Sequence, residues 1–332
     1  MASNTESNSN KVIVHNLLPH LVVYNDGTID RLRNFPIVPP QQEDPKTGVS
    51  SKDIVFSNDP YLTARLYLPK LTQTNDQNQK LSILVYFYGG AFSFESAYSS
   101  IHHAYCNLLA SQANILIASI EHRNAPEHYL PAGYNDCWDG LYWVASHATQ
   151  NPINSDPWII NHGNFNRVFI GGDSSGGNLC HNVAMRAGVE DLPGGVKVFG
   201  AYLNHPYFWG AKPIGEEPVI GFEETLQSRI WKFAYPSAPG GLDNPMINPL
   251  ASGAPSLATL GCSRMLITAA GKDQLLFRDR SERYFEAVKK SGWKGEVEFF
   301  EEKDEDHVYY MYDLETDQSK RFIKVLVDFL RQ

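Results

Sequence analysis

The stretch from Arg167 to Asn178, R-V-F-I-G-G-D-S-S-G-G-N, limits the fold of this chain more than any other feature. An apolar, β-branched run leads directly into a G-x-S-x-G pattern, and residues 179–185 follow at helical spacing. A strand, a sharp turn and a helix around such a serine form a nucleophile elbow, and the glycines remove Cβ atoms that would collide there. We therefore expect Ser174 to present a reactive hydroxyl at the edge of a sheet. The alternative is a glycine-rich strand–helix turn without chemistry.

Near-continuous apolar strands alternate with helices over most of the chain. The predicted strands are 53–56, 63–68, 81–87, 115–120, 168–170, 196–203, 265–269 and 297–300. The predicted helices are 101–112, 137–149, 178–187, 278–290 and 317–330. Buried strands separated by helices indicate an α/β fold, with a mostly parallel sheet covered on both faces. We therefore expect residues 11–332 to form a single domain.

Three segments depart from this alternation. Residues 1–10 form a polar tail that we expect to be disordered, and the polar run 72–80 is a predicted loop. Residues 12–21 are predicted to form a short helix, followed by a hairpin over 21–32 that turns at Asn-Asp-Gly. The segment 208–248, rich in Gly, Pro, Trp and Tyr, is predicted to be an insertion over the sheet. Together, about 11–50 and 208–248 are the expected lid elements.

Charge and composition exclude several classes of partner. A net charge of −9 argues against nucleic acid or an anionic membrane as the main partner, which leaves a small-molecule substrate. The four cysteines lack metal-binding spacing, so buried thiols are expected, with no metal and no cofactor. There is neither an apolar core of a secretion signal near the start nor a run long enough to span a bilayer. We expect a cytoplasmic protein, and a homodimer stays open.

A serine nucleophile needs a base and an acid, which this fold supplies in the order Ser, Asp or Glu, His. The strand 265–269 is followed by Asp273, and the strand 297–300 by a loop that carries His307. His307 would take the proton from Ser174, while Asp273 would hold the imidazole tautomer. Alternative acids stay open at three positions, Asp279, Asp304 and Asp306. Asp273 is preferred because it follows a strand end directly.

The expected oxyanion hole follows the strand 81–87, where the chain continues as Tyr-Gly-Gly-Ala-Phe. Consecutive glycines let backbone N–H groups turn toward a substrate oxygen. We assign the amides of Gly89, Gly90 and Ser175 as donors. The alternative is an ordinary Gly-Gly turn.

Several motifs of this chain together resemble the hormone-sensitive-lipase-like α/β-hydrolases. They are Tyr88–Phe92, Arg123–His128, Gly172–Gly177 and the pair Asp273/His307. Plant carboxylesterases are the most similar branch, through Asp44–Ser50, Pro239–Pro245 and Ser291–Glu296. The likeness covers nearly all of the chain after about residue 14. That branch includes 2-hydroxyisoflavanone dehydratases and the cyclases of iboga and aspidosperma alkaloid pathways, so the resemblance alone does not imply ester hydrolysis.

Two residues depart from the family pattern. The family's oxyanion loop usually begins with His, where this chain has Tyr88, and Asn124 replaces a usual Leu. A tyrosine cannot reproduce both hydrogen bonds of an imidazole. The oxyanion loop would therefore shift, or the phenol would point into the pocket as a substrate-binding group.

Three functions remain open at this point. The first is a carboxylesterase that acts on a small apolar ester through an acyl-enzyme. The second is a lyase or cyclase of plant specialised metabolism, and the third is a non-catalytic hormone receptor, against which the presence of His307 argues. Tyr207, Trp209 and Trp231 are the predicted apolar walls of the pocket, with ordinary core packing as the alternative for each.

Overall fold

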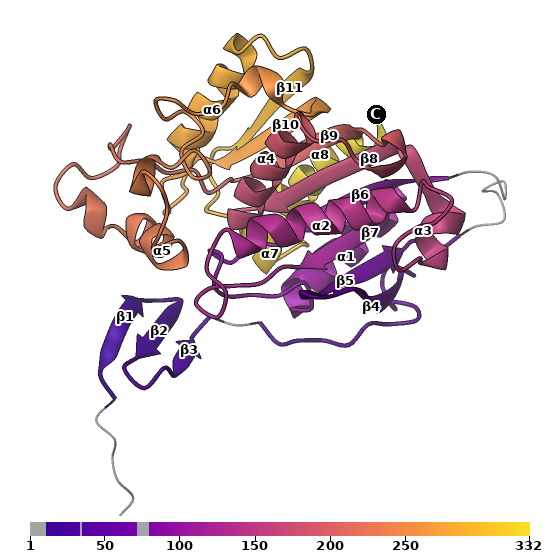
Figure 1. The fold of residues 1–332 in the computed structure, drawn as a ribbon, viewed down its shortest axis with the longest axis horizontal. Coiled ribbons are helices and arrows are strands. Elements are labelled where there is room, and N and C mark those ends of the chain that lie inside the picture. The colour runs from indigo at the N-terminus through magenta and orange to yellow at the C-terminus, as the bar shows by residue number, and fades with distance from the viewer. Residues whose placement is uncertain (1–10, 34, 72–79) are drawn as a thin grey trace, which may run out of the picture.

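The computed structural model describes residues 11–33, 35–71 and 80–332, and a large twisted sheet forms its centre (Figure 1). Its strands are β4 (Ser50–Asn58), β5 (Tyr61–Leu68), β6 (Leu81–Phe87), β7 (Leu116–Glu121), β8 (Gly163–Asp173), β9 (Val198–Asn204), β10 (Cys262–Ala270) and β11 (Glu296–Glu302). The spatial order is β11-β10-β9-β8-β6-β7-β5-β4. All neighbouring strands are parallel except β5, which runs antiparallel to both β7 and β4. The predicted mostly parallel α/β fold is confirmed.

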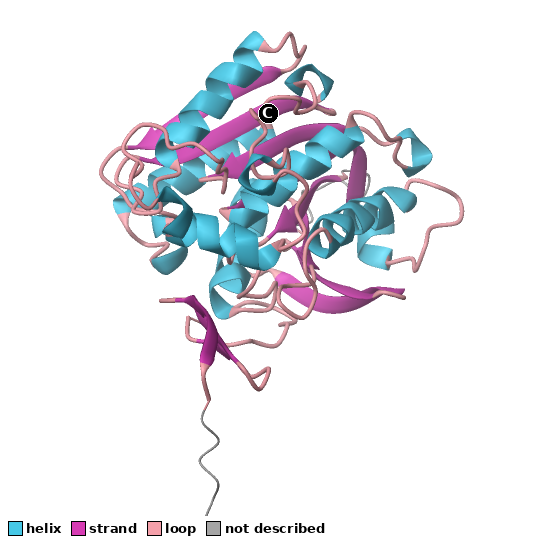
Figure 2. Ribbon diagram, turned by 60° about the vertical axis from the view of Figure 1, so that its left-hand side comes forward, coloured by secondary structure: helices cyan, strands magenta, loops and turns pink. Residues whose placement is uncertain are grey.

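Helices cover both faces of this sheet (Figures 1 and 2). The helices are α1 (Ser100–Ala113), α2 (Ala132–Ser146), α3 (Pro157–His162), α4 (Ser175–Ala187), α5 (Leu226–Ala234), α6 (Arg278–Lys290), α7 (Tyr309–Tyr312) and α8 (Asp317–Arg331). Apolar side chains of α2, α4 and α6 belong to one core cluster, and those of α1 and α8 belong to another. The sheet thus separates two apolar layers.

From residue 83 onward, the sequence of strand β6 is apolar and does not alternate between apolar and polar residues, because both of its faces are buried. Ile83 and Val85 pack into the cluster under α2 and α4, whereas Leu84 and Tyr86 pack into the cluster under α1 and α8. Successive side chains of a strand point to opposite faces, and here both faces are covered. Every residue from 83 to 88 is fully buried as a result.

The N-terminal segment corrects one prediction. A helix over 12–21 is wrong, because β1 (Ile13–Leu17), β2 (Leu21–Tyr24) and β3 (Ile29–Arg31) form a separate antiparallel sheet. The β-branched run at its start favours a strand, and Pro19 in the connecting turn cannot sit inside a helix. The hairpin predicted over 21–32 is confirmed. The predicted tail and most of the loop predicted at 72–80 lie outside the described residues.

The N-terminal sheet lies against the inserted segment that contains α5 (Figure 1). Arg229 Nη1 on α5 donates a hydrogen bond of 2.7 Å to the carbonyl oxygen of Asn16. The rings of His15 and Phe233 pack edge to face at 5.2 Å. Two segments far apart in the sequence are therefore joined at one end of the molecule.

The register of the strands sets the position of the loops that follow them. Phe87 is level with Gly172, Gly172 is level with Leu203, and Ala270 is level with Glu302. Because these strands are parallel, the loops after β6, β8, β9, β10 and β11 all open at the same edge of the sheet. This edge carries every residue that the sequence assigned to catalysis.

The four cysteines, Cys106, Cys137, Cys180 and Cys262, are all free and buried, as expected. Among the helices in the described ranges, none combines the length and the apolar character that crossing a membrane requires.

Candidate active site

Ser174 occupies the sharp turn between β8 and α4, as the G-x-S-x-G pattern predicted. Its backbone has φ 56° and ψ −118°, a conformation that non-glycine residues rarely adopt. It persists only where the contacts of the surrounding structure enforce it. Its amide donates a 2.8 Å hydrogen bond to the carbonyl oxygen of Asn204. A Cβ at Gly172 or at Gly176 would lie 2.4 Å or 2.0 Å from the Phe87 carbonyl oxygen, so only glycine fits.

His307 and Asp273 form the second part of the arrangement. His307 Nδ1 lies 2.9 Å from Asp273 Oδ2, and Asp273 is buried just after β10. Burial by itself would raise the pKa of Asp273, but the charge of His307 and its hydrogen bond hold that pKa below the usual value. A second hydrogen bond of 2.8 Å, from the amide of Leu275, fixes the carboxylate. The carboxylate is thus ionised and oriented toward the imidazole.

The three alternative acids make other contacts. Asp279 and Asp304 form ion pairs with basic residues at the surface, and Asp306 accepts hydrogen bonds from backbone amides, including that of His307. None of these carboxylates bonds to the His307 ring. The structure therefore brings Asp273, and not its alternatives, to the imidazole.

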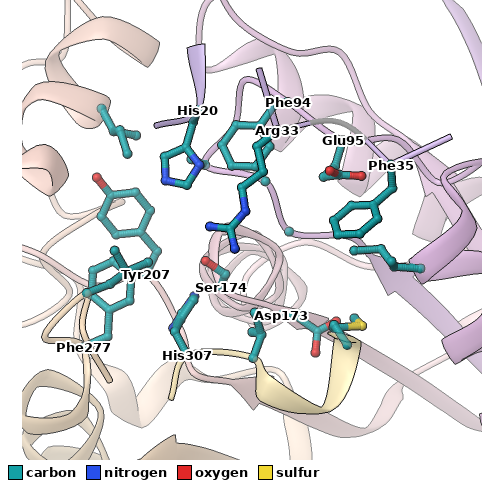
Figure 3. Close-up of a pocket in the computed structure, with 18 of the residues that line it drawn as sticks. His20, Arg33, Phe35, Phe94, Glu95, Asp173, Ser174, Tyr207, Phe277 and His307 are labelled. Carbon is teal, nitrogen blue, oxygen red and sulfur yellow. The ribbon is translucent and has the colours of Figure 1, made fainter. Parts of the chain in front are cut away.

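Ser174 and His307 face the same pocket, which holds about 780 Å³ of space including its solvent-open part (Figure 3). His307 Nε2 is enclosed and has no hydrogen-bond partner in the described part of the chain. Its other nitrogen is held by Asp273, so Nε2 is the atom that can accept the serine proton. The imidazole of His307 therefore stands between Asp273, which holds Nδ1, and the pocket that Ser174 faces.

The glycine loop after β6 lies beside Ser174. Gly89 and Gly90 line the pocket, and neither of their amides donates a hydrogen bond within the described residues. Gly90 has φ 117°, and a Cβ at Gly89 would lie 2.7 Å from the Asp173 carbonyl oxygen. Ser175 is the first residue of α4, directly after the nucleophile. The arrangement leaves backbone N–H groups available near the serine.

Tyr88 does not line the pocket, which corrects its assignment as a substrate-binding residue. Its ring is fully buried and stacks on His122 with centroids 4.1 Å apart. Its hydroxyl donates to the His122 carbonyl oxygen at 2.9 Å and accepts from Asn124 Nδ2 at 3.1 Å. The phenol therefore points toward the loop after β7 and does not enter the pocket.

Of the three aromatic residues expected to form the pocket walls, one does so. Tyr207 lines the pocket, whereas Trp209 and Trp231 do not. Both tryptophans are fully buried, and their indole N–H groups donate to Ser228 Oγ at 2.8 Å and to the Gly241 carbonyl oxygen at 2.9 Å. The aromatic content of the insertion serves mainly its own packing.

The remaining pocket walls come from residues that no motif singled out. The N-terminal segment contributes His20, Arg33 and Phe35, and α5 contributes further apolar residues. Figure 3 shows Glu95 and Phe35 on one side of Ser174, with Tyr207 and Phe277 on the other. Sequence reasoning missed them because they come together only through contacts between distant segments.

Glu95 is the one acidic wall residue besides Asp173. Its two carboxylate oxygens are enclosed and unpartnered within the described part of the chain, and its backbone has φ 75°. Burial raises the pKa of this carboxyl group. Its position in the loop after the glycines was the only sequence signal that could have indicated it.

His205, Asp273 and His307 are the only residues in the described part of the chain that are clustered closely enough to hold a metal ion. One ligand atom from each lies within 4.8 Å of the others. However, His205 Nδ1 accepts a 2.9 Å hydrogen bond from the amide of Val308. A neutral ring then carries its proton on Nε2 and has no lone pair left for a metal. The hydrogen bonds of these three residues therefore fit a structural and catalytic arrangement around His307 better than a metal site.

Comparisons with known proteins agree with the fold. Residues 84–311 match the sequence model of a family with the alpha/beta hydrolase fold. A 2-hydroxyisoflavanone dehydratase of Glycyrrhiza echinata is 54% identical over 99% of this chain and 100% of its own. Catharanthine synthase of Catharanthus roseus is 42% identical over 100% of this chain and 99% of its own. Probable carboxylesterase 2 of Arabidopsis thaliana is 39% identical over 95% of this chain and 96% of its own. Among solved structures, the esterase LipW from Mycobacterium marinum has a TM-score of 0.68 at 22% identity, covering 87% and 83%, a likeness of fold.

Proposed function

Because the chain belongs to the α/β-hydrolase family and is a carboxylesterase-like enzyme, we propose that it hydrolyses an ester of a small apolar plant metabolite through an acyl-enzyme on Ser174. The observation that carries this proposal is the hydrogen bond between Asp273 and His307, whose ring lines the same pocket as Ser174. Dehydratase relatives match 99% and 96% of the chain, so a second function is considered below.

The proposed reaction begins with Ser174. Its hydroxyl gives its proton to His307 Nε2 as the oxygen attacks the ester carbonyl carbon. The negative oxygen of the tetrahedral intermediate accepts hydrogen bonds from the amides of Gly89, Gly90 and Ser175. His307 then protonates the leaving alcohol, and a water molecule hydrolyses the acyl-enzyme by the same steps. Asp273 holds the imidazolium that forms in each half of the reaction.

The N-terminal sheet and α5 are proposed as the lid of this pocket. Their contact through Arg229 and Asn16 supports a shared roof, and residues from both segments line the space above Ser174. A roofed pocket of this volume suits a compact substrate with ring systems. The cytosolic location expected from the sequence stays a prediction that fractionation would test, and light scattering would decide the open question of a homodimer.

Elimination of water from a β-hydroxy ketone is the second candidate. It is favoured by full-length relatives at 54% and 50% identity that are named 2-hydroxyisoflavanone dehydratase. His307 would remove the proton α to the ketone, the glycine amides would bind the developing enolate oxygen, and the β-hydroxyl would leave with a proton as water. This route forms a C=C bond and needs no acyl-enzyme on Ser174.

One pair of assays separates the two candidates. Wild type, Ser174→Ala and the surface control Ser252→Ala are assayed with p-nitrophenyl butyrate and with a 2-hydroxyisoflavanone. For the esterase, wild type and the control turn over the ester and bind a fluorophosphonate probe, and Ser174→Ala loses ester turnover by at least about a thousandfold. If the wild type does not turn over the ester, and Ser174→Ala still dehydrates the 2-hydroxyisoflavanone, the result would favour elimination.

A further inference from the structure

The pocket contains a histidine that neither catalytic route uses. His102 lies in the first turn of α1, is 3% exposed and lines the same pocket as Ser174. Its Nδ1 lies 2.9 Å from the hydroxyl oxygen of Tyr86. Because this imidazole forms part of the wall, its protonation decides what the wall offers to a substrate.

The partners of Tyr86 fix the tautomer of His102. The Tyr86 hydroxyl donates its single proton to Asp173, a buried carboxylate that also accepts hydrogen bonds from Tyr310 and Asn204. Burial raises the pKa of Asp173 above its usual value, but the three hydrogen bonds oppose that rise and favour the ionised form, so this carboxylate acts as an acceptor. Tyr86 has no second proton, so its oxygen must accept the hydrogen bond, and His102 Nδ1 must donate it. The ring proton of His102 therefore sits on Nδ1.

The second nitrogen of His102, Nε2, then carries a lone pair that no residue in the described ranges uses. Within the described residues the His102 ring makes only the hydrogen bond through Nδ1, and the ring lines the pocket, so we take Nε2 as the atom that it offers to a ligand. Burial lowers the pKa of His102 to about 3. The ring stays neutral at physiological pH, and its open nitrogen is a permanent hydrogen-bond acceptor.

We propose that Nε2 of His102 accepts a hydrogen bond from a hydroxyl group on an aromatic ring of the substrate, so that the pocket selects phenolic substrates. Phe35, Ile101 and Met311 line the same pocket and favour an aromatic ring over an open-chain alcohol. Arg33 also lines it, and its positive charge disfavours an ammonium group as the donor. A buried acceptor that stays unpaired is unfavourable, so a ligand that supplies the missing donor gains affinity.

The proposal concerns the pocket named above and depends on the proposed function only for treating that pocket as the substrate site. It is tested with two ligands that cannot be hydrolysed, 4-(4-hydroxyphenyl)butan-2-one and its methyl ether, 4-(4-methoxyphenyl)butan-2-one. Their dissociation constants are measured by calorimetry on the full chain. In wild type we expect the phenol to bind about tenfold more tightly than the ether, the effect of one buried hydrogen bond.

Two variants locate the acceptor. His102→Leu should reduce the preference for the phenol to less than about twofold, whereas His102→Gln, which keeps an acceptor, should retain part of it. His20→Leu makes the same change at another neutral histidine of the wall and should keep the preference. Equal binding of the two ligands by wild type, or loss of the preference in His20→Leu but not in His102→Leu, overturns the proposal.

A measurement on the wild type keeps the test independent of folding in the variants. In a histidine-labelled sample, the His102 ring should show the neutral Nδ1–H tautomer down to pH 5, and Nε2 should shift with the phenol but not with the ether. An Nε2–H tautomer contradicts the proposal. Because neither ligand is an ester, absence of ester turnover would reject the proposed function while leaving this result intact.

Discussion

Tyr88 and Asn124 are the two positions that depart from the family pattern, and in the folded chain they touch each other. The Asn124 amide donates to the Tyr88 hydroxyl, which in turn donates to the backbone at His122. In the sequence they are separated by both α1 and β7, so nothing local indicated that they belong together. The pair ties the start of the oxyanion loop to the loop after β7.

The pair should be energetically coupled. Tyr88→Phe removes the acceptor of the Asn124 amide, and Asn124→Leu removes the donor, so the second change should cost less once the first is made. We expect a coupling energy of about 0.5–1.5 kcal/mol in the free energy of unfolding in urea. As the control, Asn124→Leu combined with Tyr61→Phe at an exposed site should be additive. Additivity of Tyr88→Phe with Asn124→Leu would contradict the coupling.

Asp273 should be the only one of the four candidate acids with a large catalytic effect. Asp273→Asn keeps the size of the side chain but favours the wrong His307 tautomer, so kcat for an ester should fall by about 10³–10⁴-fold with little change in KM. Asp279→Asn and Asp304→Asn, whose carboxylates lie in surface ion pairs, serve as controls and should change kcat by less than about threefold. A mild effect at Asp273 with a severe one at either control would reject the assignment.

The three residues of the proposed triad could be brought together from the sequence because each follows a strand of the parallel sheet. A strand end is a local pattern, and parallel strands bring such ends to one edge without further information. The walls of the pocket could not be found in this way. His20, Arg33 and His102 meet Ser174 only through the packing of whole elements, which no local pattern records.

Among the elements, the N-terminal sheet and α5 form the part of the pocket that the sequence placed least well. The sequence indicated that both segments lie over the site, but it predicted a helix where β1 lies. Apolar residues at the start of this segment fit a helix or a strand, and only pairing with β2 decides between them. The long, strongly patterned helices, such as α6 and α8, were placed within a residue or two.

Removing residues 1–20 should change substrate selection. This deletion takes away β1 and His20, opens the roof, and should raise KM or shift the preference toward longer acyl chains. Because Leu17 is buried, we also expect a lower melting temperature. The control deletion, residues 1–10, should leave both properties unchanged. Profiles of p-nitrophenyl esters from acetate to octanoate measure the effect, and an unaltered profile in the longer deletion would contradict the proposed lid.

For the whole molecule, several buried histidines make stability dependent on pH. Burial lowers the pKa of His102, His181 and His205 to about 3, whereas an unfolded chain holds them near 6.5. Below pH 6.5 the unfolded chain therefore binds more protons than the folded one. The stability that these residues contribute is complete above pH 6.5 and is lost as the pH falls toward 3.

Urea unfolding at pH 7, 6 and 5 should show this loss, and a variant should assign part of it. His181 packs against Tyr284, with Nδ1 2.7 Å from the hydroxyl oxygen. His181→Gln lowers stability at pH 7. Between pH 6 and 5, however, it should reduce the slope of the free energy of unfolding against pH by about 1 kcal/mol per pH unit, because one fewer buried histidine takes up a proton on unfolding. His128→Gln, at an exposed site, should leave the slope unchanged. A slope in His181→Gln equal to that of wild type would refute the assignment.

The position of the last helix has a practical consequence. Arg167, within the strand β8 that leads to the elbow, donates hydrogen bonds to the carbonyl oxygens of Leu330 and Gln332. Seven residues of extended chain then separate this point from Ser174, roughly 23 Å. An affinity tag or a surface linker attached after Gln332 would thus sit at the far edge of the sheet. A tag attached near residue 11 would lie beside the N-terminal sheet, which is part of the proposed lid. Enzyme for kinetics or immobilisation is therefore best tagged at the C-terminus.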